Sequence, residues 1–101
     1  MINTKDIRDR IETDFGNNST EVFTMLEQAV LKIDYLNSDR IVRCILFLAD
    51  KDFEKLKRNI ESATNDPRDV ILWAEYTNLG QWEKVKRVRD FSQTFSDAAK
   101  I

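Results

Sequence analysis

Apolar residues recur every three or four positions along most of the chain. In the first third, one apolar stripe runs from Ile7 to Phe15 and a second runs from Val22 to Leu36. This period is typical of helices that bury one face. The pattern therefore predicts two amphipathic helices, separated by the Gly-Asn-Asn sequence at residues 16–18.

The middle of the chain carries its most apolar segment, from Ile41 to Leu48. A helix over these residues would be apolar on nearly all sides, and such a helix belongs inside a domain. A further stripe, from Phe53 to Ala63, predicts a fourth helix on the surface of this central one.

The last third begins with the strongest helix start in the sequence, Asp66 followed by Pro67. An acidic cap before a proline at the first helical position is a favoured beginning for a helix. We expect this fifth helix to close near Gly80, where a left-handed residue would stop it. An apolar stripe over residues 82–95 predicts a sixth helix, and residues 97–101 are expected to fray.

An internal similarity links two of these segments. At an offset of 29 residues, Phe-Glu-Lys-Leu-Lys-Arg at 53–58 aligns with Trp-Glu-Lys-Val-Lys-Arg at 82–87. Either the similarity is chance between two charged helices, or residues 37–65 and 66–95 are two copies of a helical hairpin. The predicted fold is all-α: one domain over residues 1–101, with five or six antiparallel helices in αα-hairpins.

Composition excludes most catalytic chemistry. The 101 residues include no His and a single Cys, at position 44 in the most apolar segment. Histidine-based catalysis, histidine-ligated metals and an internal disulfide are therefore excluded. We predict no catalytic, cofactor-binding or metal-ligating residues, and no enzymatic activity.

The same counts bear on location. No apolar run approaches the roughly 20 residues of a membrane span, and the N-terminal residues have no apolar core of a secretory signal. Because small secreted domains usually depend on paired cysteines, we expect a cytoplasmic protein without membrane contact.

The remaining candidates for function are surface side chains. The net charge is -2, so the whole domain is not basic enough to indicate nucleic-acid binding. We predict a non-catalytic interaction module that binds another protein or a second copy of itself. The alternative is a binder of nucleic acid or an acidic partner, through the cations of residues 55–58 and 84–89. The candidate surface comprises three aromatic and five basic residues: Trp73, Tyr76, Trp82, Lys55, Arg58, Lys84, Arg87 and Arg89. The simpler interpretation is that the aromatic residues pack in the core and the cations are solvated.

Overall fold

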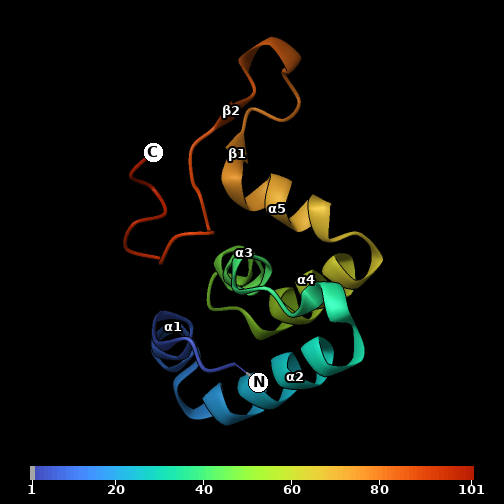
Figure 1. Cartoon of the computed structure of the whole chain (residues 1–101), viewed down its shortest axis with the longest axis vertical. Helices are drawn as coiled ribbons and strands as arrows, with labels where there is room; N and C mark the ends of the chain where they lie inside the picture. Colours follow the sequence, from blue (N-terminus) through green and yellow to red (C-terminus); the bar gives the residue numbers. More distant parts are fainter. Residues whose placement is uncertain (1) are drawn as a thin grey trace.

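Helices dominate the first three quarters of the chain in the computed structural model, which describes residues 2–101 (Figure 1). The α-helices are α1 (Lys5–Phe15), α2 (Ser19–Lys32), α3 (Asp39–Ala49), α4 (Phe53–Asn65) and α5 (Pro67–Glu75), and short 3-10 turns lie at Gly16–Asn18 and Asp34–Leu36. The predicted all-α class is confirmed. The second helix ends at Lys32, before the expected Leu36, and Leu36 is buried from the 3-10 turn that follows it.

Polar side chains fix where three of these helices begin. The hydroxyl of Ser38 accepts from the Ile41 N–H at the start of α3, and the Asp52 carboxylate accepts from the Lys55 N–H at the start of α4. Asp66 caps α5 with Pro67 at the first position, as the sequence predicts. These side chains replace the partners that the first N–H groups of a helix lack.

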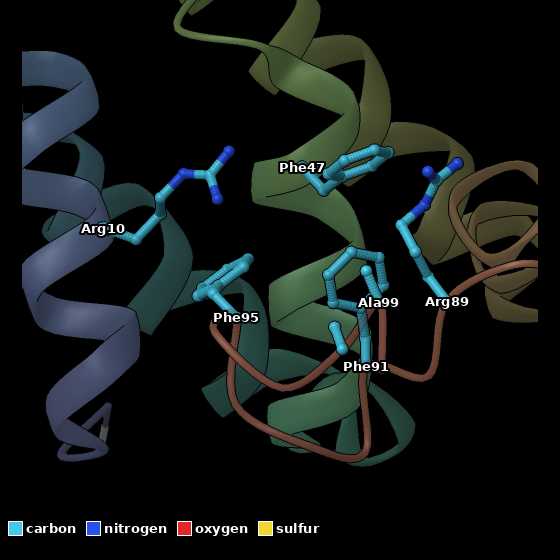
Figure 2. A pocket seen from close by; sticks show the side chains of 7 residues that line it. Arg10, Phe47, Arg89, Phe91, Phe95 and Ala99 are labelled. Carbon is cyan, nitrogen blue, oxygen red and sulfur yellow. The ribbon is translucent and has the colours of Figure 1, made fainter. Parts of the chain in front are cut away.

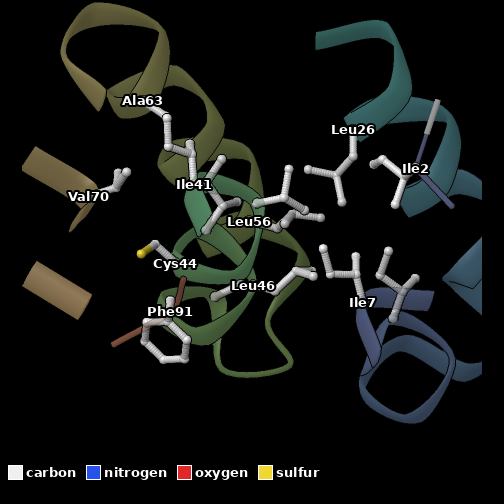
Figure 3. Packing of buried hydrophobic residues seen from close by; sticks show 14 of the residues in the cluster. Ile2, Ile7, Leu26, Ile41, Cys44, Leu46, Leu56, Ala63, Val70 and Phe91 are labelled. Atoms are coloured by element: carbon white, nitrogen blue, oxygen red, sulfur yellow. The ribbon is translucent and has the colours of Figure 1, made fainter. Parts of the chain in front are cut away.

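The third helix is the centre of the domain, as predicted. It packs against α1, α4 and α5, and seven of its eleven residues are buried. Figure 3 shows side chains from the surrounding helices converging on it, with Ile7 on one side and Val70 on the other. Phe91, far along the chain, closes the same core.

The prediction of a sixth helix over residues 82–95 is wrong. After α5, strand β1 (Tyr76–Thr77) pairs antiparallel with strand β2 (Lys86–Arg87), and a 3-10 turn, η3 (Trp82–Lys84), lies between them. We call residues 76–87 the arm, because they project from the end of α5 (Figure 1). Residues 88–101 form no helix and return across the helical body; we call them the strap.

Contacts with the helical body explain why the first residues of the strap do not form a helix. The N–H groups of Val88 and Arg89 donate to the Glu75 carbonyl, and the Phe91 N–H donates to the Glu75 carboxylate. Backbone groups bonded in this way have no need of partners four residues away along a helix. The valines at 85 and 88 are three residues apart, as in a helix, so these contacts with distant residues override the local periodicity.

Two smaller expectations fail in the same region. Asn78, not Gly80, takes the left-handed conformation, with φ of 61°, and α5 has already ended at Glu75. The chain end is not frayed at Ala98, whose side chain is buried and whose carbonyl accepts from the Asp90 N–H at 2.7 Å.

The 29-residue similarity has no counterpart in the secondary structure. Residues 37–65 do contain a helical hairpin, α3 and α4, but residues 66–95 contain α5 followed by the arm and part of the strap. The matching hexapeptides are helix at 53–58 and a 3-10 turn with a strand at 82–87. A duplicated helical hairpin is therefore not confirmed.

Candidate functional site

Glu75 holds the beginning of the strap. This residue at the end of α5 is completely buried, and its carboxylate accepts two hydrogen bonds from Arg40 of α3, at 2.9 and 2.6 Å. Arg87 donates to it at 3.0 Å, and so does the backbone N–H of Phe91. One carboxylate thus joins α3, α5, the arm and the strap.

Asp6 repeats this arrangement for the middle of the strap. Its carboxylate accepts two hydrogen bonds from Arg43 of α3, both at 3.0 Å, and a third from the backbone N–H of Phe95. Arg43, which is almost fully buried, also donates to the Phe91 carbonyl. Two arginines one helical turn apart on α3 therefore orient two carboxylates, and each carboxylate holds one strap N–H.

The charges in both groups are compensated. Burial alone would raise the pKa of Asp6 and of Glu75, but hydrogen bonds from arginine and from the strap backbone outweigh it, so both pKa values lie below the ordinary range. Among the described residues, every buried side-chain polar atom has a hydrogen-bond partner. These carboxylates stabilise the fold and are not poised as acids or bases.

The arm presents the most exposed aromatic residue of the structure. Its ladder pairs Tyr76 with Arg87, and its loop is closed by a hydrogen bond from the Asn78 amide to the Lys84 carbonyl at 3.1 Å. Trp82 lies in η3 near the outer end of this loop, with 89% of its surface exposed. The arm is a defined structure that holds an indole in solvent.

The other predicted aromatic residues lie at the root of the arm. Trp73 is on α5 and is 45% exposed, whereas Tyr76, in β1, is half-buried. The three aromatic residues thus belong to one continuous stretch of chain, and exposure is lowest at Tyr76 and highest at Trp82.

The predicted cations do not form one surface. Arg87 pairs with Glu75 and Asp90, while Arg89 donates to the Ala74 carbonyl and stacks on Phe47. Lys84 is exposed on the arm, and Lys55 and Arg58 are exposed on α4. The predicted sixth helix that would have carried Lys84, Arg87 and Arg89 is absent, because residues 82–95 form no α-helix.

A pocket that the sequence analysis missed lies between α1, α3 and the strap. It has a volume of about 250 Å³, and its lining comprises three phenylalanines, two arginines and two alanines: Phe47, Phe91, Phe95, Arg10, Arg89, Ala98 and Ala99 (Figure 2). The helical interpretation placed Phe91 and Phe95 on one helix face. The predicted helix gave no indication of the pocket, because these two rings lie beside α1 and α3 only in the observed strap.

No metal or thiol chemistry is indicated in the part of the chain that the structure describes. No group of three or more acidic or cysteine side chains is placed to hold a metal ion. Cys44 is buried, and burial raises the pKa of its thiol to about 12. A thiol with this pKa is protonated and unreactive at neutral pH.

Comparisons with models of protein families, with curated proteins and with solved structures found no match for the chain. Within residues 2–101, none of the helices combines the length and apolar character of a membrane span. Function therefore has to be argued from the geometry of the arm and the strap.

Proposed function

We propose that this protein is a non-catalytic interaction module that inserts Trp82 into a pocket on a partner protein. The observation that carries the proposal is the 89% exposure of this indole near the outer end of a closed arm. Trp is among the most enriched residue types at the energetic centres of protein interfaces.

The energetics of an exposed indole support this use. Burying a large apolar side chain contributes about 2 kcal/mol, and that contribution is forgone while Trp82 remains in water. The same contribution becomes available to a complex in which a partner covers the ring. Single exposed aliphatic residues, such as Leu31 on α2, are common on protein surfaces and need no such explanation.

The structure of the arm reduces the cost of binding. The β1–β2 pairing and the Asn78 hydrogen bond to Lys84 already order the loop. Arg87, hydrogen-bonded to Glu75, fixes the base of the arm to the helical body. A loop ordered before binding loses less conformational entropy when a partner docks.

Photocrosslinking in the native cell tests the proposal. A photoreactive phenylalanine analogue replaces Trp82 in one variant and Leu31, 75% exposed on α2, in the matched control. We expect a discrete crosslinked protein from position 82 and none from position 31. Identical products from both positions, or none from position 82, would refute the arm as the binding element.

Binding to nucleic acid or to an acidic partner remains the alternative, through Lys84 with Lys55 and Arg58. It has fewer available cations than the sequence implied, because Arg87 pairs with Glu75 and Asp90 and Arg89 lines the pocket beside the strap. A position-82 product that nuclease removes would support nucleic acid. Affinity that falls steeply between about 50 and 200 mM salt would likewise indicate phosphate contacts.

A further inference from the structure

The pocket beside the strap has a floor and walls suited to a flat ring. Phe47 and Phe91 lie with ring centroids 5.1 Å apart, and Phe95 meets Phe91 edge-on at 5.8 Å. Small side chains, Ala98 and Ala99, leave space opposite these rings. A volume of about 250 Å³ lies below the usual range for drug-sized ligands, so one or two fused rings are the appropriate size.

Both charged residues that line the pocket are arginines. The guanidinium of Arg89 stacks on Phe47 at 4.5 Å, and that of Arg10 stacks on Phe95 at 4.6 Å. In Figure 2 the two arginines lie on opposite sides of the phenylalanines. Stacking holds each guanidinium plane in place, so that its N–H edge is ordered before a ligand arrives.

The charge of Arg10 is balanced by Asp14, whereas that of Arg89 has no carboxylate partner among the described residues. Arg10 uses its Nε to pair with Asp14 at 2.6 Å. Arg89 uses its Nε to donate to the Ala74 carbonyl at 2.7 Å, and no carboxylate of the described residues pairs with it. No acidic side chain of the described chain lines the pocket. One guanidinium group without a carboxylate partner, that of Arg89, thus lines a largely apolar cavity.

We propose that this pocket binds a small aromatic carboxylate, with its ring against the phenylalanines and its carboxylate on Arg89. Planar guanidinium groups bind carboxylates through paired hydrogen bonds, and the stacked rings supply the apolar contact. The site is independent of the arm and of the function proposed for it.

Charge opposes binding of the Trp82 side chain of a second copy of the protein in this pocket. Trp82 of a second copy would carry an indole of suitable shape, but Lys84 and Lys86 of the same arm are exposed beside it. Docking that arm here would bring two lysines and a single acid, Glu83, toward the unpaired charge of Arg89. Like charges across an interface oppose binding, whereas an anionic ring relieves the repulsion.

Nuclear magnetic resonance titration of the full chain with 2-naphthoate tests the proposal, and 2-naphthalenemethanol serves as the neutral analogue. We expect saturable shifts at the amides of Phe91, Phe95, Ala98 and Ala99, and an affinity for the alcohol that is about tenfold weaker. Equal affinities would overturn the role of Arg89. Shifts elsewhere, or no saturation below about 10 mM, would overturn the site.

Variants separate recognition of the carboxylate from a loss of structure. R89Q should weaken 2-naphthoate binding about tenfold and leave the alcohol unaffected, while R58Q, on α4 and outside the pocket, should change neither. Amide protection of Phe91 and Phe95 reports whether the strap stays in place. If R89Q opens the strap, Arg89→Lys takes its place, because it keeps the charge but loses the paired donors, and it should still weaken 2-naphthoate binding. Unchanged 2-naphthoate affinity in a variant that keeps its strap would refute the proposal.

Discussion

The helical body and the strap are held together by different kinds of interaction. In the body, α3 packs against α1, α4 and α5, α2 packs on α1, and apolar side chains of these helices form the bulk of the core. The strap contributes only Phe91 and Ala98 to the fully buried set. It is positioned instead by N–H groups that donate to carboxylates anchored on α1 and α5.

Because of this difference, we expect the helical body and the strap to tolerate different kinds of substitution. Apolar packing is spread over many contacts and follows from periodic sequence positions. The strap depends on two carboxylates, each of which is oriented by one arginine of α3. The body should therefore respond to changes in volume and polarity, and the strap to changes in charge.

The largest effect is expected in the body. Ile45→Asp places an unpaired charge in the centre of α3, and we expect it to unfold the domain, with a loss of about 4 kcal/mol or more. Leu31→Asp, on an exposed position of α2, should change the stability by less than about 0.5 kcal/mol. Urea unfolding measures both. A folded Ile45→Asp protein with unchanged stability would contradict the central placement of α3.

Removing the charge of Glu75 should affect the strap more than the body. Glu75→Gln keeps the side-chain shape but weakens the pairs with Arg40 and Arg87. Breaking a buried pair can cost 3–5 kcal/mol, but both arginines are over a third exposed, so we expect about 2 kcal/mol.

The region in which amide exchange accelerates shows whether Glu75→Gln acts on the strap or destabilises the whole domain. Amide exchange should accelerate at Phe91 before it does so in α3. Glu83→Gln, an exposed change of the same kind on the arm, should have no measurable effect. Uniform acceleration across the body would show that Glu75 does not act through the strap.

Acid should release the strap before it unfolds the body. The pKa values of Asp6 and Glu75 lie below their ordinary values of 3.8 and 4.5, so protons bind more tightly to the unfolded chain. Their stabilising contribution is complete above those ordinary values and is lost as the pH falls through the folded pKa values.

An acid titration followed by amide exchange checks this order. Protection of Phe91 and Phe95 should decline at a higher pH than protection of α3. The decline at Phe91 should be reduced in Glu75→Gln, which has lost one of the titrating groups. Simultaneous loss across the domain would mean that the strap and the body form a single cooperative unit.

The smallest effect on stability is expected at the arm. Trp82→Ala removes a side chain that is mostly in solvent, and the free energy of unfolding should change by less than about 0.5 kcal/mol. The intrinsic fluorescence should lose its most red-shifted component, because the remaining Trp73 is less exposed. A strongly blue-shifted emission of the unmodified protein would contradict an exposed Trp82.

The sequence predicted the elements that depend on local signals. The cap at Asp66 and the central position of α3 follow from neighbouring residues and from periodicity. Trp82 was recognised as a candidate anchor, but only the structure places it on an arm rather than on a helix.

The strap could not be predicted in the same way, because its partners are distant in sequence. Phe95 is 89 residues from Asp6, and no local pattern links them. One signal was present: Arg43 interrupts the most apolar segment of the chain, and a buried arginine requires an acidic partner. That requirement indicates a buried ion pair without identifying Asp6, so the pocket that the strap completes also stayed hidden.

Amide hydrogen exchange of residues 82–95 tests most directly whether carboxylates, and not a helix, hold this part of the chain. We predict that the N–H groups of Phe91 and Phe95 are protected while the exposed Thr94 and Ser96 exchange rapidly, and that Asp6→Asn reduces protection at Phe95. Continuous protection from residue 86 to residue 95, unaffected by Asp6→Asn, would indicate a helix and contradict the strap.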